Sequence, residues 1–266
     1  MIDKIDIKVC RNILIPRFDT FGDIVLLQGF IKALLDLLPD AKFTLLVRDG
    51  YDHLSTMFPD QLIWKTTRIN PYKGRPGPLE VSLALKELSG NLYDLVLITT
   101  YSRTWLDDLV AAKLTSSWRV GIGESADIPD YLARILPDLG IETASCPYDE
   151  FVSVEERTRE TEKYQILWEK LAGDKRPLPP PELSIPKDAD KMAEEVLARL
   201  GLTDESYYFC FPAGIANVFL KSWPEEKFAK IIAEIEKKYK LRALVVGHET
   251  EKEIIDKVIG LARQKG

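Results

Sequence analysis

The most constraining feature of the sequence is a strand–helix–strand pattern near its start. Residues 12–17 read NILIPR, a short apolar run that predicts a buried strand. Residues 24–38 carry apolar side chains at helical spacing and are followed by Pro39, which cannot continue a helix. The next apolar run, residues 42–47, predicts a second strand. Units of this kind are typical of α/β folds built on a parallel sheet.

The alternation continues to the middle of the chain, where a proline-rich run interrupts it. Three more elements are predicted in this part: strands at residues 92–100 and 118–122 and a helix at about residues 154–171. Arg176 then opens the segment RPLPPPE, and such runs form stiff, extended spacers. We therefore expect two domains, one at residues 1–175 and one at residues 176–266.

The second half carries few predicted elements. They are helices at residues 188–200, 224–239 and 251–264 and strands at residues 207–211 and 242–246. A parallel sheet covered on both faces usually needs about four to six strands. We expect the second domain to be incomplete in this chain. A fragment of a longer protein is favoured over a domain completed by a partner chain.

Composition excludes several classes of protein. The chain has 36 basic and 42 acidic residues, a net charge of −6, whereas nucleic-acid-binding domains usually show a basic excess. Three scattered cysteines indicate a reducing compartment, and the absence of CxxC and HxxxH pairs makes a metal site improbable. The amino-terminal segment lacks the apolar core of a signal peptide. We expect a cytoplasmic protein that rests at most on a membrane surface, with no nucleic-acid partner.

The first candidate site is the segment RFDTFGD at residues 17–23, between the first strand and its helix. Ligands of open α/β sheets bind beyond the carboxyl ends of the strands, which is where this loop lies. Gly22 permits a close backbone approach, and Asp23 is an ionised carboxylate that can accept a hydroxyl proton. The alternative, which position alone favours, is that an acidic or hydroxyl residue of this loop only caps the helix. The dinucleotide pattern GxGxxG is absent.

The second candidate site follows the strand at residues 207–211. The strand leads into a loop that contains Gly214, and Ser222 and Glu225 have the spacing of a capping box. Lys221 stands just before the predicted helix, where a cation opposes the helix dipole unless an anion lies between them. A phosphate or diphosphate would satisfy both the lysine and the free amide groups. A solvated lysine beside an ordinary cap is the equal alternative.

Two weaker groups of candidate site residues are an acidic residue of the second half and basic residues of the first. Glu251 follows the strand at residues 242–246 and can accept hydrogen bonds from ribose hydroxyls, although acidic residues in a first helical turn are common for dipole reasons alone. Thr250 and Glu253 match another capping box. Basic residues follow at loop positions that can hold an anionic acceptor, although a solvated surface is the more frequent explanation. These basic candidates are Lys65, Arg68 and Arg103.

Taken together, these segments resemble glycosyltransferase family 9, the bacterial heptosyltransferases of lipopolysaccharide core assembly. The similarity runs in order through residues 13–47, 119–123, 153–173, 209–232 and 244–253. The Gly-Asp loop and the segment KSWPEEKF, about two hundred residues apart, are more specific as a pair than either is alone. The resemblance implies the GT-B architecture, in which two Rossmann-like domains face a cleft, and inverting transfer without a metal or other cofactor.

The resemblance also implies residue roles. Asp23 is the expected general base, and Lys221 is expected to neutralise the departing diphosphate. The expected donor-binding residues are Gly22, Gly214, Lys221, Ser222 and Glu251. The expected acceptor-binding residues are Lys65, Arg68 and Arg103. The implied donor is a nucleotide sugar, ADP-heptose, and the implied acceptor is an anionic glycolipid of the lipopolysaccharide type at the inner membrane surface.

One family motif has no counterpart, because the Asp-x-Gly-x-x-His segment of the donor site is absent before Gly266. An alternative from another class is a non-catalytic nucleotide-sugar-binding module completed by a partner chain. A nucleotide-dependent oxidoreductase has only the strand–helix–strand pattern in its favour and lacks the glycine fingerprint.

Overall fold

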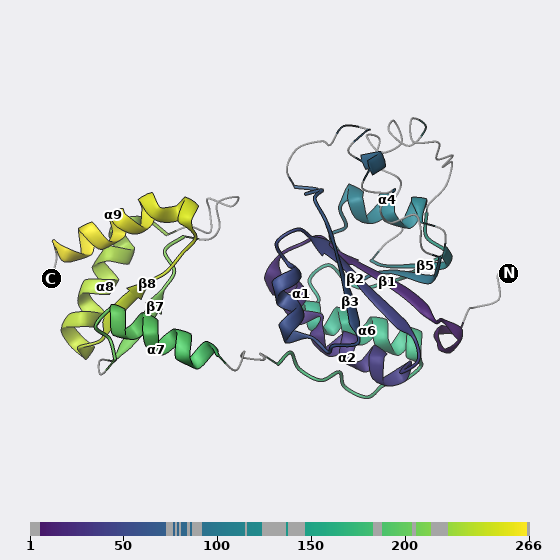
Figure 1. Cartoon of the computed structure of the whole chain (residues 1–266), viewed down its shortest axis with the longest axis horizontal. Helices are drawn as coiled ribbons and strands as arrows, with labels where there is room; N and C mark the ends of the chain where they lie inside the picture. The colour runs from purple at the N-terminus through teal and green to yellow at the C-terminus, as the bar shows by residue number, and fades with distance from the viewer. Residues whose placement is uncertain are drawn as a thin grey trace. The chain divides into compact units, whose positions relative to one another are not determined.

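The computed structural model of the chain consists of two compact units, residues 1–185 and 186–266. It describes residues 6–72, 77, 79, 81–83, 86, 92–114, 116–123, 137, 147–182, 188–203, 206–213 and 223–264. Figure 1 shows both units.

The first unit is built on a parallel sheet. In the described part of the chain the sheet has six strands: β1 (Asn12–Arg17), β2 (Lys42–Arg48), β3 (Leu62–Thr67), β4 (Tyr93–Ile98), β5 (Ser116–Ile122) and β6 (Glu150–Val152). Their order is β3-β2-β1-β4-β5-β6, and each neighbouring pair is parallel. The order reverses between β1 and β4. Ligands of doubly wound folds bind at such a switch point, beyond the carboxyl ends of the strands.

Helices cover both faces of this sheet (Figure 1). One face packs against α1 (Phe21–Leu26), α2 (Gln28–Leu37) and α6 (Glu160–Ala172), and the other packs against α4 (Trp105–Lys113). Successive side chains of a strand point to opposite faces. Ile13 and Ile15 of β1 therefore pack with Trp168 of α6, whereas Leu14 packs with Leu109 of α4. Burial on both faces explains why β1 reads as a continuous apolar run.

The central strand β1 contains a proline that shapes the switch point. β1 pairs with β2 along its whole length, up to Arg17 beside Val47, but its pairing with β4 ends at Leu14. Pro16 has no backbone N–H to donate, so a continuous ladder on both sides of β1 is excluded. The ladder between β1 and β4 therefore stops before the carboxyl end of β1.

The helix predicted at residues 24–38 is interrupted in the structure. α1 begins earlier, at Phe21, and the break falls at Leu27, whose N–H donates to the carbonyl oxygen of Ile24 three residues back. The helix predicted from residue 154 begins six residues later, at Glu160. β3, β6 and α4 were not predicted. Lys65, expected in a loop, lies within β3.

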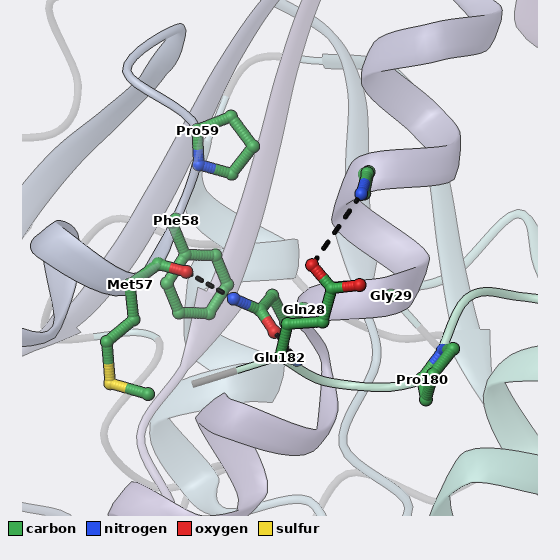
Figure 2. A pocket seen from close by; sticks show the side chains of 8 residues that line it. Gln28, Gly29, Met57, Phe58, Pro59, Pro180 and Glu182 are labelled. Carbon is green, nitrogen blue, oxygen red and sulfur yellow. Dashed lines mark hydrogen bonds and ion pairs between the residues drawn. The ribbon is translucent and has the colours of Figure 1, made fainter. Parts of the chain in front are cut away.

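The proline-rich segment packs against the first unit. The side chain of Gln28 donates to the carbonyl oxygen of Met57 and accepts the N–H of Glu182 at 2.5 Å. Figure 2 shows the pocket that these residues line. Gln165 of α6 accepts the N–H of Leu178 at 2.9 Å. Residues 176–182 therefore form a strap held by α2 and α6, and the division between the compact units follows at Ile185.

The second unit has a two-stranded parallel sheet in its described part, formed by β7 (Tyr207–Cys210) and β8 (Arg242–Val245). Its helical elements are α7 (Ala189–Arg199), α8 (Glu225–Tyr239), the 3-10 turn η5 (Glu249–Glu251) and α9 (Lys252–Arg263). α8 and α9 pack together around Ala229, Ile232 and Val258, which are buried. No residue of β7 or β8 is buried.

Candidate functional site

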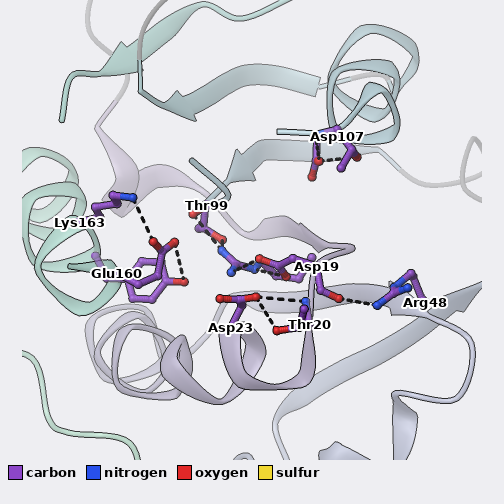
Figure 3. Close-up of polar contacts among 11 residues, drawn as sticks. Asp19, Thr20, Asp23, Arg48, Thr99, Asp107, Glu160 and Lys163 are labelled. Carbon is purple, nitrogen blue, oxygen red and sulfur yellow. Dashed lines mark hydrogen bonds and ion pairs between the residues drawn. The ribbon is translucent and has the colours of Figure 1, made fainter. Parts of the chain in front are cut away.

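The carboxyl edge of the first sheet gathers polar and charged side chains from several loops. β1 ends at Arg17 and leads into Asp19 and the first turn of α1, while β4 leads through Thr99 to the first turn of α4. Both loops lie at the switch point between β1 and β4. Figure 3 shows the polar contacts made there, together with those of Glu160 and Lys163 at the start of α6.

Arg17 joins the two strands where their ladder has ended. Its guanidinium is fully buried, and Nη1 donates to the carbonyl oxygen of Thr99 at 2.9 Å and to the Thr99 hydroxyl at 3.1 Å. Nη2 and Nε donate to the two carboxylate oxygens of Asp19 at 2.5 Å and 3.1 Å. This two-pronged geometry is the strong form of an arginine–carboxylate contact. Arg17 thereby fixes the start of the Gly-Asp loop to the neighbouring strand.

The charges around Arg17 are coupled. Burial opposes the charge of Arg17, but Tyr164, Asp19, Glu160 and Asp23 together raise its pKa above the ordinary value, and the guanidinium is a permanent cation. Burial raises the pKa of the Asp19 carboxyl, Arg17 lowers it, and Asp23 adds to the rise, so the net direction is upward.

Asp23 is bound to the turn that precedes it. Its Oδ2 accepts the N–H of Thr20 at 3.2 Å and the Thr20 hydroxyl at 2.6 Å, which is the arrangement of a capping box (Figure 3). Asp23 therefore does cap the helix, as the alternative interpretation expected, and it does so through Oδ2. Among the described residues, Oδ1 of Asp23 accepts no hydrogen bond, and the side chain is only half-buried. The carboxylate is held in one orientation with one oxygen left for a ligand.

A second capping box at α4 repeats this arrangement in a buried setting. Oδ2 of Asp107 accepts the N–H of Thr104 at 2.6 Å and the Thr104 hydroxyl at 2.7 Å. Asp107 is only 1% exposed, and its Oδ1 is buried with no hydrogen-bond partner in the described part of the chain. Burial therefore raises the pKa of Asp107 to about 7, although the hydrogen bonds from Thr104 oppose this rise. Asp107 is not among the residues expected from the sequence, where the TxxD spacing shared with Thr20–Asp23 is the signal that points to it.

The basic residues expected to bind the acceptor lie in different settings. Lys65 is half-buried and pairs in register with Leu46, which places it on the α4 side of the sheet. Arg68 follows β3 and is almost fully exposed, with Nε 3.8 Å from a carboxylate oxygen of Asp49.

Arg103 follows β4, and its guanidinium is engaged by the protein. It donates to the carbonyl oxygen of Ile122 at 2.5 Å, lies 3.4 Å from Asp108, and stacks over the Phe151 ring at 4.9 Å from the centroid. These contacts give Arg103 a structural role at this edge.

Arg48 is a further cation at the edge that the sequence analysis did not single out. It is the last residue of β2, and its Nη2 donates to the carbonyl oxygen of Asp19 at 2.7 Å and to the hydroxyl of Tyr51. Its guanidinium also lies 4.5 Å from the ring centroid of Tyr51. Arg48 therefore ties the loop after β2 to the loop that carries Asp23 (Figure 3).

Three of the expected donor-binding residues, Gly214, Lys221 and Ser222, lie outside the described residues. α8 begins at Glu225 with Pro224 at its N-cap, and the predicted capping box of Ser222 and Glu225 includes a residue outside the described part of the chain.

Glu251 forms a capping box with His248, whereas the predicted box paired Thr250 with Glu253. Its Oε2 accepts the N–H of His248 at 2.8 Å, and the ring Nδ1 of His248 accepts the N–H of Thr250 at 3.2 Å. The predicted box of Thr250 and Glu253 is therefore wrong. Gly247 packs closely here, since a Cβ at this position would lie 2.7 Å from Oε2 of Glu251.

No helix among the described residues is long and apolar enough to span a bilayer. Within the same residues, no group of three or more His, Cys, Asp or Glu side chains is arranged to hold a metal ion.

Comparison with known proteins gives matches of structure only. No protein-family model matches the sequence. No curated protein sequence matches it at a significant level. Among solved structures, the chain is similar to a family 9 glycosyltransferase from Veillonella parvula, with 18% identity and a TM-score of 0.64 over 96% of this chain and 66% of that one.

Two enzymes from Escherichia coli are similar in the same way. ADP-heptose lps heptosyltransferase II matches at 14% identity and a TM-score of 0.62, over 96% of this chain and 70% of that one. Heptosyltransferase WaaC, solved with ADP-2-deoxy-2-fluoro heptose, matches at 16% identity and a TM-score of 0.57, over 93% of this chain and 72% of that one. This chain thus spans roughly two thirds of the length of each. The likeness shows that the α/β fold expected from the resemblance to these transferases is correct.

Proposed function

We propose that this chain belongs to an inverting glycosyltransferase that moves a heptose from ADP-heptose to a lipopolysaccharide-type acceptor. The observation that carries the proposal is the position of Asp23. Its carboxylate is fixed at the switch point of a sheet whose fold is shared with heptosyltransferases, and Oδ1 is left for a ligand. In the proposal the nucleotide sugar is a substrate, and no metal ion or other cofactor takes part.

Asp23 acts as the general base in this proposal. Oδ1 accepts the proton of an acceptor hydroxyl while the hydroxyl oxygen forms a bond to the anomeric carbon of the heptose. The bond from that carbon to the diphosphate oxygen breaks, and ADP leaves. Thr20 holds Oδ2, so the carboxylate does not rotate away from the acceptor. General-base catalysis of this kind contributes about 10²–10⁴-fold to a rate.

The donor side is assigned to the second domain. Lys221 neutralises the diphosphate as ADP leaves, and the backbone at Gly214 and Ser222 approaches the phosphate oxygens. Gly22 allows the first loop to come close to the donor. Glu251 binds the ribose through Oε1, because its Oε2 already accepts the N–H of His248.

The acceptor is assigned to the carboxyl edge of the first sheet. Arg68 and Lys65 are available to anionic groups of the acceptor, and Arg103 supports the edge through its contacts with Asp108 and Ile122. An acceptor of this class places the protein on the cytoplasmic surface of the inner membrane.

The decisive experiment replaces Asp23 by asparagine. Asp23→Asn keeps an oxygen that accepts the hydrogen bonds of Thr20 but removes the base. We expect kcat for ADP formation from ADP-heptose and heptose-free lipopolysaccharide to fall about 10²–10⁴-fold, with an unchanged dissociation constant for ADP-heptose measured by calorimetry.

Asp6→Asn is the matched control, because Asp6 also caps a turn, accepting the N–H of Lys8 at 3.0 Å, but it precedes β1, at the end of the strand opposite to the switch point. It should leave turnover unchanged. Turnover of Asp23→Asn within tenfold of the wild-type value would rule out the base assignment. Binding of ADP-heptose by the wild-type chain without any transfer would favour the binding-module alternative.

A further inference from the structure

An exposed row of aromatic side chains lies beside Asp23 at the carboxyl edge of the sheet. Phe21 opens α1, Tyr51 and His53 follow β2, and Tyr72 follows β3. We call Phe21, Tyr51 and His53 the aromatic platform. Because β1, β2 and β3 are adjacent and parallel, the loops after them meet at the same edge.

The platform is held together by ring contacts. The rings of Phe21 and Tyr51 are 4.1 Å apart between centroids, and those of Phe21 and His53 are 5.3 Å apart. The Arg48 guanidinium lies 4.5 Å from the centroid of Tyr51 and 5.6 Å from that of Tyr72. These stacking and cation–π contacts fix the rings in place before any ligand arrives.

Tyr51 is half-buried and packs against the core of the first unit, but the other rings of this edge stay uncovered. Phe21 is 44% exposed and Tyr72 is 54% exposed, and His53 is also exposed. Single exposed apolar side chains are ordinary, whereas a contiguous exposed set marks a surface that binds something. Burial raises the pKa of the Tyr51 hydroxyl, and the Asp23 carboxylate adds to this rise, so Asp23 lies within electrostatic range of the platform.

We propose that the aromatic platform is the acceptor subsite and stacks against a sugar ring of the acceptor. A pyranose ring has an apolar face of C–H groups and a rim of hydroxyls. The rings of Phe21 and Tyr51 match that face, while Asp23, Thr20 and His53 supply polar partners for the rim. Sites that combine fixed aromatic surface with a few placed polar groups are typical of small-molecule recognition. This inference rests on the proposed transferase function and names the part of the acceptor that is bound.

The test separates ring stacking from other effects with three variants. Phe21→Ala removes the aromatic face, Phe21→Tyr keeps it, and Ile63→Ala removes an apolar side chain of β3 that is 43% exposed, close to the exposure of Phe21. The probe is deacylated, heptose-free lipopolysaccharide core. Its binding is followed by saturation-transfer NMR, which reports the sugar-ring protons in contact with the protein and needs no turnover. Circular dichroism verifies that each variant is folded.

We expect the Phe21→Ala variant to bind the probe about tenfold more weakly and to lose the signals of the sugar-ring protons. Phe21→Tyr and Ile63→Ala should stay within about twofold of the wild-type affinity. In the transfer assay the KM for the acceptor should rise in Phe21→Ala, with the KM for ADP-heptose unchanged.

The outcomes are distinct. Equal affinity of wild type and Phe21→Ala would overturn the subsite, as would binding of intact lipopolysaccharide without binding of the deacylated core, because the platform would then serve acyl chains. Phe21-dependent binding without any heptose transfer would leave the subsite standing and refute the proposed function. Heptose transfer with an acceptor KM that does not depend on Phe21 would support the proposed function and refute the subsite.

Discussion

The buried carboxyl of Asp107 makes stability depend on pH in a direction that can be worked out. The ordinary pKa of aspartate is about 3.9, and burial raises that of Asp107 to about 7 in the folded chain. The folded chain therefore binds this proton more tightly than the unfolded chain does. The stabilisation from this group is complete below pH 4 and is lost as the pH rises through 7.

The size of the effect follows from the shift. Each unit of pH between the two pKa values changes the free energy of unfolding by about 1.4 kcal/mol. From pH 5 to pH 7 the wild-type chain should thus lose about 2 kcal/mol through Asp107, because the folded carboxyl is already half-ionised at pH 7. Asp107→Asn keeps the size of the side chain and an oxygen for the N–H of Thr104, but it does not titrate. The free energy difference between wild type and variant should therefore change by about 3 kcal/mol between pH 5 and pH 8.

The assay is urea unfolding of both proteins at pH 5, 6, 7 and 8, followed by tryptophan fluorescence. Four of the five tryptophans report on the first unit, namely Trp64, Trp105, Trp118 and Trp168. Asp6→Asn is the control, since it alters a capping carboxylate that is exposed instead of buried. A difference between wild type and Asp107→Asn that stays constant from pH 5 to pH 8 would refute the reasoning that burial outweighs the capping hydrogen bonds.

Two further predictions concern the first unit. Arg17→Met should destabilise it by about 3–5 kcal/mol, because Asp19 is left as a buried, uncompensated carboxylate. Adding Asp19→Asn to this variant should recover part of that loss. If the losses of stability of the two single variants, measured by urea unfolding, simply add up in the double variant, Arg17 and Asp19 are not a coupled pair. Gly29→Ala should lower stability by about 1–3 kcal/mol, since its Cβ would overlap the carbonyl oxygen of Pro179 in the strap. Gly260→Ala in α9 meets nothing within 4 Å and should instead stabilise by about 0.5–1 kcal/mol; equal thermal shifts for both glycine variants would dispute the close contact at Gly29.

Local patterns revealed the elements whose side chains are buried on both faces. β1, β2 and β4 were predictable because strands of a covered parallel sheet read as unbroken apolar runs. β3 was missed because it lies at the edge of the sheet, and only its first and last residues are buried, so it does not read as an unbroken apolar run. α4 was missed because Asp107 and Asp108 are buried in its first turn, where a sequence pattern reads them as a polar surface.

The sequence by itself determined the strand–helix alternation, the Gly-Asp loop and the TxxD spacing at Thr20 and Thr104, because these depend on neighbours within a few residues. Only the tertiary structure decided which loops meet. Arg17 reaches Thr99 across 82 positions because β1 and β4 are neighbours and Pro16 ends their ladder. The buried setting that shifts Asp107 and the row of rings from Phe21 to Tyr72 likewise arise from strand order. Distant segments meet through packing and pairing register, which no local pattern specifies.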